Sequence, residues 1–157
     1  MSAFDRLNAI EEIKILKARY FRSLDTKDWA SMEQTMTPDV ICDYRGAATD
    51  PATGINAVPG ATEKPLAGRM EAIEMLRRGL DGVVTAHQGY MPEIEILNTT
   101  HARGIWAMYD ALRFPFGGDL AELHGFGHYH ETYECHAGRW LIASLRLTRL
   151  RVDIVSR

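Results

Sequence analysis

IEEIKILKARYFRSLDTKDW, residues 10–29, carries the helical pattern around which the rest of the chain is arranged. Its stripe of apolar side chains has the spacing of an amphipathic helix and consists of Ile10, Ile13, Leu16, Tyr20 and Leu24. We expect Lys14, Lys17 and Arg22 to lie off this stripe. The polar run at the end contains Asp25, which is either a solvent-exposed terminator or the first half of a catalytic pair.

Composition describes an ordinary globular protein. The chain has 157 residues, 46% hydrophobic and 25% charged, which predicts one domain, residues 1–157, with a core and a pocket. The net charge of −3 argues against nucleic acid or an anionic membrane as partner. No apolar run could span a bilayer and no signal core precedes the helix, so we expect a cytoplasmic protein. Cys42 and Cys135 are expected to stay reduced, and no nucleotide motif or other sign of a cofactor appears.

Short elements follow the first helix. The pattern predicts a helix at residues 29–36, a strand at 39–46, a long loop at 46–68 and a helix at 69–80. Asp28 is a good N-cap for the first of these, and Pro38 ends it. The loop is rich in proline and glycine, and loops of this length often act as lids or binding loops.

From residue 83 the polarity alternates with a period of two. We predict strands at about 83–97, 99–115, 121–136 and 139–153, joined by turns at 98–100 and 136–138. Pro92 predicts a bulge in the first strand, because proline cannot donate a ladder hydrogen bond. Helices followed by long antiparallel strands predict an α+β fold, in which a strongly curved sheet wraps around the helices and encloses a cavity.

One strand row combines a carboxylate with apolar side chains. By alternation, the shared face holds Trp106, Met108, Asp110, Leu112 and Phe114. Burial of a lone carboxylate is costly, so Asp110 needs a partner or a function unless the row faces solvent. Arg146, in line with Trp140, Ile142 and Ser144, could neutralise Asp110 or hold an oxyanion. Arg149 and Arg151 on the opposite face compete for this role.

His87, on the preceding strand, is either a hydrogen-bonded core or surface residue or a general base. A carboxylate bonded to an imidazole fixes its tautomer and increases its basicity, and Asp25 could supply it. Tyr20 and Asp25 lie about 140° apart on an ideal helix, so we expect the helix to break near residues 23–25 if both face one site. Tyr44 could place a phenol in the cavity or be a plain core residue.

The third long strand carries three histidines on one face, His124, His128 and His130. Positions two apart on a strand face are about 7 Å apart, so three ligands from one strand make an awkward metal site. We therefore expect no metal and treat His128 as a pocket or surface residue. Phe126 is expected to join Trp106, Met108 and Leu112 in an apolar pocket wall.

The opening helix ending in YFRSLDTKDW, the strand TAHQGYMPEIEI and the hairpin GHYHETYECHAGRWLIASLRLTRL occur in a characteristic order. In this order and spacing, residues 4–153 resemble the SnoaL-like polyketide cyclase branch of the nuclear transport factor 2-like superfamily. Within this branch the chain looks most like the bile acid 7α-dehydratases, scytalone dehydratases and hexachlorocyclohexane dehydrochlorinases. Enzymes of these families eliminate a leaving group from a ring without a metal or organic cofactor.

The resemblance implies roles for five residues: Asp25 and His87 as the catalytic pair, Tyr20 as a third group, Asp110 as a second acid and Arg146 as the late arginine. It implies a cofactor-independent, dehydratase-type lyase that acts on a small cyclic, mostly apolar substrate. It also implies a homodimer or homotrimer formed through the open sheet face. A ketosteroid-type isomerase and a noncatalytic ligand-binding or assembly module remain as alternatives, because fold alone does not establish catalysis.

Overall fold

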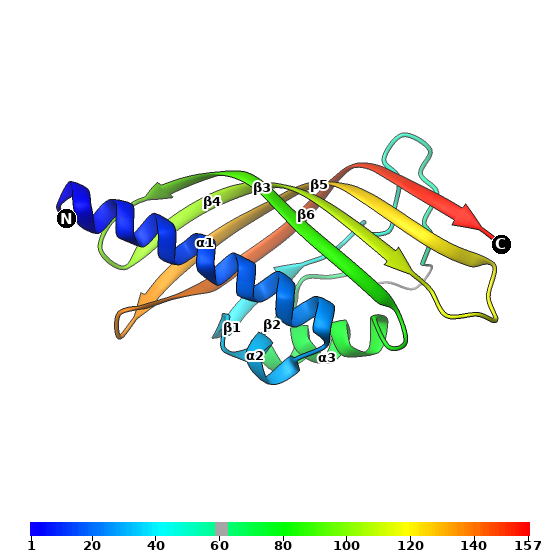
Figure 1. The fold of residues 1–157 in the computed structure, drawn as a ribbon, viewed down its shortest axis with the longest axis horizontal. Helices are drawn as coiled ribbons and strands as arrows, with labels where there is room; N and C mark the ends of the chain where they lie inside the picture. Colours follow the sequence, from blue (N-terminus) through cyan, green and yellow to red (C-terminus); the bar gives the residue numbers. More distant parts are fainter. Residues whose placement is uncertain (59–62) are drawn as a thin grey trace.

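The computed structural model describes residues 1–58 and 63–157, in which three helices lie against one six-stranded, unclosed sheet (Figure 1). The helices are α1 (Ala3–Thr26), α2 (Trp29–Glu33) and α3 (Arg69–Gly79). The strands are β1 (Met36–Asp43), β2 (Leu66–Ala67), β3 (Val84–Ile96), β4 (His101–Arg113), β5 (Leu120–His136) and β6 (Arg139–Ser156). The predicted α+β class, with the helices first and the long strands after them, is confirmed.

Helix α1 begins seven residues before the predicted stretch 10–29 and ends three residues before that stretch does. It begins at Ala3 because the Ser2 hydroxyl accepts a hydrogen bond from the Asp5 amide at 3.1 Å, while the Asp5 carboxylate accepts one from the Ser2 amide at 2.9 Å. The break near residues 23–25, expected only if Tyr20 and Asp25 face one site, does not occur, since the helix runs unbroken to Thr26. Lys27 then ends it in the left-handed region, with φ of 59°.

The strands follow the order β2-β1-β6-β5-β4-β3. The four long strands form an antiparallel meander, as predicted, but β1 pairs with β6 in parallel, so the sheet is mixed. Strands joined by a hairpin must be antiparallel, whereas β1 and β6 are separated by β2, α3 and the other strands and can therefore pair in parallel. Strand β2 lies inside the predicted long loop, and residues 59–62 of that loop lie outside the described residues.

Bulges change which side chains face the helices. The predicted bulge at Pro92 is confirmed by a shift in the β3–β4 register between Tyr90 and Glu93. In β6 the register with β5 skips Ala143 and Leu150. A skipped residue reverses the alternation beyond it. Ile142 faces the core before the first skip, whereas Leu145 and Leu147 face it afterwards.

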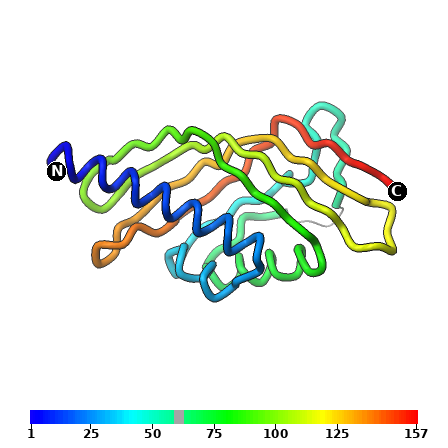
Figure 2. Tube along the Cα trace, viewed as in Figure 1, coloured from blue at the N-terminus to red at the C-terminus, as the bar shows by residue number. Residues whose placement is uncertain are grey.

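The core lies between α1 and the sheet, with α2 and α3 at one end (Figures 1 and 2). Helix α1 contributes Ile13, Tyr20 and Leu24, and these side chains are at most 2% exposed. The expectation for Lys17 is wrong, because this lysine lies within the buried stripe and is 0% exposed. Among the described residues, no helix is both long enough and apolar enough to cross a membrane.

Candidate active site

A cavity of about 150 Å³ lies between α1, α3 and the inner face of the sheet, which is the face toward the helices. Its walls are mostly apolar and include Leu24, Met75, Leu80, Leu112, Leu123 and Leu147. Its polar lining consists of Tyr20, Tyr44, His87, Asp110, Tyr129 and Arg149. A mostly apolar pocket with a few convergent polar groups is typical of a small-molecule site.

Asp25 and His87 form a hydrogen-bonded pair beside this cavity. His87 Nδ1 lies 2.6 Å from Asp25 Oδ1, and the backbone N–H of His87 donates to Asp25 Oδ2 at 2.9 Å. The Thr85 hydroxyl also donates to Asp25, at 2.9 Å. Burial would raise the pKa of Asp25, but the hydrogen bonds from His87 and Thr85 hold that pKa below its usual value. An ionised Asp25 favours the tautomer in which Nδ1 carries the proton.

The pair forms without the predicted helix break. Strand β3 packs against α1, so the Asp25 carboxylate reaches His87 from the last helical turn. The His87 ring, whose side chain is 7% exposed, then lines the cavity into which Tyr20 projects. The Phe21 ring stacks on it at 6.3 Å between centroids and 10° between planes. Nε2 of His87 has no hydrogen-bond partner among the described residues, so it can accept a proton.

Two phenols form a second polar group in the cavity. The hydroxyls of Tyr20 and Tyr44 lie 2.9 Å apart. Burial raises the pKa of Tyr20 and the pKa of Tyr44 well above their usual value, so both phenols stay neutral. One phenol donates to the other, which leaves one O–H of the pair to donate elsewhere.

Asp110 pairs with Arg149, not with Arg146. Arg149 Nη2 donates to Asp110 Oδ2 at 2.7 Å, and the two side chains are 6% and 3% exposed. Arg149 Nε also donates to the carbonyl of Ala47 at 2.7 Å. The pair spans β5 at Gly125, where an added Cβ would overlap both Asp110 Oδ1 and Arg149 Nη1. The pair in its observed arrangement therefore needs a residue without a Cβ at position 125.

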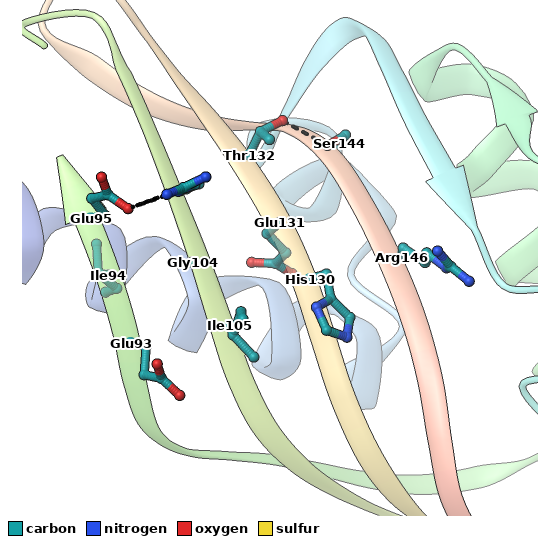
Figure 3. A pocket seen from close by; sticks show the side chains of 11 residues that line it. Glu93, Ile94, Glu95, Gly104, Ile105, His130, Glu131, Thr132, Ser144 and Arg146 are labelled. Carbon is teal, nitrogen blue, oxygen red and sulfur yellow. Dashed lines mark hydrogen bonds and ion pairs between the residues drawn. The ribbon is translucent and has the colours of Figure 1, made fainter. Parts of the chain in front are cut away.

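Arg146 lies on the other face of the sheet, against the prediction. Its side chain is 67% exposed and approaches Asp43 at 4.0 Å. It lines an outer groove of about 650 Å³ with His130 and Thr132, shown in Figure 3. The bulge at Ala143 is the physical reason, because it turns Ser144 and Arg146 outward and brings Arg149 inward. Strict alternation from Trp140 could not detect this bulge.

Phe126 and His128 also lie on the outer face. The predicted place of Phe126 in the pocket wall is therefore wrong, and of the two alternatives for His128, pocket or surface, the structure shows the surface. Phe126 packs against Tyr109, with ring centroids 5.0 Å apart. The inner row of β5 is instead Leu123, Gly125, Gly127, Tyr129, Glu131 and Tyr133. Two glycines in this row gave no hydrophobic signal, so the opposite row, with its larger side chains, was predicted to face the pocket. Tyr129, which lines the cavity, was missed for this reason.

The β4 row faces inward as predicted, but Trp106 and Met108 are not among the residues that line the cavity, so their predicted place in its wall is wrong. Asp110 and Leu112 line the cavity, and Met108 accepts a hydrogen bond from Arg149 at its sulfur, at 3.3 Å. Trp106 lies deeper, where its indole N–H donates to the Tyr133 hydroxyl at 2.8 Å. Among the described residues, no group of three His, Cys, Asp or Glu side chains could hold a metal ion.

A second buried ion pair lies behind the cavity wall. The Lys17 ammonium binds the Glu131 carboxylate, and these side chains are 1% and 0% exposed. The ammonium also lies 3.7 Å from the centroid of the Tyr129 ring. Burial lowers the pKa of Lys17, and Glu131 opposes that shift. The spacing of Ile13, Lys17, Tyr20 and Leu24 is helical, so the sequence did contain a signal for the buried lysine.

Comparison with known proteins places this geometry in a family. The family model of the SnoaL-like domain matches residues 5–146. A candidate scytalone dehydratase from Novosphingobium aromaticivorans has a TM-score of 0.79 at 15% identity, with 98% of this chain and 92% of that chain covered. A hexachlorocyclohexane dehydrochlorinase, LinA-type3 from Novosphingobium barchaimii, has a TM-score of 0.76 at 15% identity, covering 98% and 94%.

A protein of unknown function from Mycobacterium tuberculosis, solved as a single-residue variant, has a TM-score of 0.70 at 21% identity, covering 91% of this chain and 77% of that chain. At these identities the solved structures show a common fold. The family match covers most of the chain and agrees with the order of helices and strands. The chain therefore belongs to the SnoaL-like domain family, within the nuclear transport factor 2-like superfamily.

Proposed function

We propose that this protein is a cofactor-independent lyase that eliminates a small leaving group, such as hydroxide, from a small cyclic substrate. The observation that carries the proposal is the Asp25–His87 hydrogen bond beside an apolar cavity that His87 lines. A noncatalytic carrier has no need of an oriented base. The names of the dehydratase and the dehydrochlorinase with the same fold are consistent with an elimination.

In the proposed reaction, Nε2 of His87 removes a proton from a carbon next to an activating group. The electrons of the broken C–H bond form the new double bond, and the leaving group departs with the electrons of its own bond. His87 then returns the proton, so departing hydroxide leaves as water. Asp25 holds the Nδ1 proton and stabilises the imidazolium.

The remaining polar groups act on the oxygen atoms of the substrate. The free O–H of the Tyr20–Tyr44 pair donates to the activating carbonyl or to the departing oxygen. The Asp110–Arg149 pair replaces the predicted pair with Arg146 and orients the substrate next to the base. Residues His87 and Asp110 are register partners on neighbouring strands, so their side chains lie side by side on the inner face.

Cavity size narrows the substrate. A volume of about 150 Å³ is close to that of an engineered protein cavity that binds benzene. We therefore propose that the part of the substrate inside the cavity is a single ring with a hydroxyl and an activating carbonyl. A fused multi-ring substrate would have to extend beyond the described cavity.

The test is a mass-spectrometric screen of hydroxylated single-ring ketones for loss of water, followed by variants. His87→Ala and Asp25→Ala should each lower turnover at least about 100-fold, the lower range for a positioned acid or base. His128→Ala, a matched control on the outer face, should keep full turnover. A product of unchanged mass would favour the isomerase. Full turnover by folded His87→Ala would remove the base from the mechanism.

A further inference from the structure

Lys27 occupies a backbone position that favours glycine. Its φ of 59° lies in the left-handed region, where only Lys27, Met91 and Ala137 are non-glycine among the described residues. Met91 lies at the β3 bulge and Ala137 in the β5–β6 hairpin, where local geometry requires such angles. A lysine at the end of α1 carries the same strain, although glycine would end the helix without it. The Lys27 side chain is therefore expected to make contacts that a glycine could not make.

The side chain reaches back toward the proposed catalytic pair. The Lys27 ammonium donates to the Thr85 hydroxyl at 2.9 Å and to the carbonyl of Leu24 at 3.3 Å. The Thr85 hydroxyl in turn donates its own proton to Asp25 Oδ1 at 2.9 Å, the oxygen that binds His87. A hydroxyl can accept and donate at once, so the chain of hydrogen bonds is continuous.

We propose that Lys27 is a positioning residue that orients the Asp25–His87 pair and adjusts its charge through the Thr85 hydroxyl. Its catalytic consequence rests on the proposed function, whereas its effect on the imidazole does not. The ammonium favours the Asp25 carboxylate in its ionised, oriented form. It also opposes a second positive charge on the neighbouring imidazole.

Other charged groups near the imidazole stay unchanged in the variants below. The charged groups around it are Arg22, Asp25 and Lys27 from α1 and its end, Asp110 from β4 and Arg149 from β6. Asp110 and Arg149 neutralise each other at 2.7 Å, and the cavity phenols Tyr20, Tyr44 and Tyr129 stay neutral because burial raises the pKa of each. Removal of Lys27 thus takes one positive charge from beside Asp25 and His87, while Arg22 remains.

The experiment is an NMR titration of the His87 imidazole in the full chain, with its signal assigned by its absence in His87→Gln. In Lys27→Met the pKa of His87 should rise by about 0.5–1 unit, the size expected for loss of one partly screened charge. Lys27→Arg should restore the wild-type titration within about 0.2 unit, because it keeps the charge. The acid limb of kcat/KM should move by the same amount.

Two further variants separate this role from helix capping. Lys27→Gly relieves the backbone strain, so it should unfold no more easily than Lys27→Met. The pKa of His87 should shift by the same amount in both variants. In a Thr85→Val background, Lys27→Met should shift the pKa of His87 by less than half as much as it does in the wild-type background. An unchanged His87 titration in Lys27→Met would overturn the proposal, and an undiminished effect without the Thr85 hydroxyl would overturn the relay. The titration needs no substrate, so failure of the lyase screen would not affect it.

Discussion

Two buried ion pairs lie on opposite sides of one cavity wall. The Lys17–Glu131 pair is sealed behind the wall, with side chains 1% and 0% exposed. The Asp110–Arg149 pair, 3% and 6% exposed, lines the cavity itself. Each pair joins an acid and a base that are far apart in the sequence. Asp110–Arg149 spans the inner face of the sheet, and Lys17–Glu131 joins the sheet to α1.

The difference lies in what else binds each pair. Tyr133 donates to Glu131 at 2.5 Å, and Lys17 lies over the rings of Tyr20, Phe21 and Tyr129. Both carboxylate oxygens of Glu131 and the ammonium of Lys17 thus have partners within the core. By contrast, Asp110 Oδ1 has no hydrogen-bond partner among the described residues. The oxygens of Glu131 are thus both occupied, whereas Asp110 keeps one oxygen for the substrate contact that we propose.

Breaking the sealed pair should give the largest loss of stability. Lys17→Met leaves the Glu131 carboxylate buried without a counter-charge, which should cost about 3–5 kcal/mol of unfolding free energy. Urea unfolding measures this loss. The double variant Lys17→Met/Glu131→Gln should recover most of it, because no charge is then left alone. A double variant as unstable as the single one would mean that packing, not charge, holds this region.

Breaking the cavity pair should cost less stability and more activity. Arg149→Met also leaves a carboxylate alone, but the adjacent cavity can admit water to Asp110, so we expect a loss of about 1–3 kcal/mol. Turnover should fall at least about tenfold through loss of substrate orientation. Arg146→Ala is the matched control on the exposed face of the same strand, with a change within about 0.5 kcal/mol. Equal effects of the two arginine variants would refute the inward placement of Arg149.

Gly125→Ala tests the gap through which the cavity pair meets. An added Cβ would overlap Arg149 Nη1, so the guanidinium must move. We expect a loss of about 1–2 kcal/mol from overpacking, together with lower turnover. Gly118→Ala, where nothing lies within 4 Å of the added carbon, controls for the loss of a glycine. Thermal unfolding and turnover measure the two effects, and wild-type values of both in Gly125→Ala would show that the pair does not need the gap.

The smallest expected effect is the dependence of stability on pH at Asp25. Burial would raise the pKa of Asp25, but the bonds from His87 and Thr85 keep it below the usual value of about 3.9. The unfolded chain therefore takes up the proton first. This contribution to stability is complete above about pH 4 and is lost as the pH falls through the folded pKa. Urea unfolding between about pH 3 and 6 should show a shallower loss for Asp25→Asn than for wild type.

Local sequence patterns predicted much of the fold. The helical spacing around Ile13 and Leu24 and the alternation after residue 83 predicted the principal helices and all four long strands, and Pro92 marked its bulge correctly. The hydrogen bond between Asp25 and His87 was also anticipated. These features follow from neighbours in the sequence or from the order of elements, which the family resemblance made specific.

The parallel pairing of β1 with β6, the inner row of β5 and the arginine in the cavity were decided only in three dimensions. No local signal marks the bulge at Ala143, yet this bulge places Arg149 rather than Arg146 at the site. From the sequence, Gly125 is only a poor strand former, whereas the structure shows that Asp110 and Arg149 meet across it. The sequence by itself determined which elements form, because helix and strand periods are local. The tertiary structure decided which side chains share the cavity, because one skipped residue in a strand reverses every side chain beyond it.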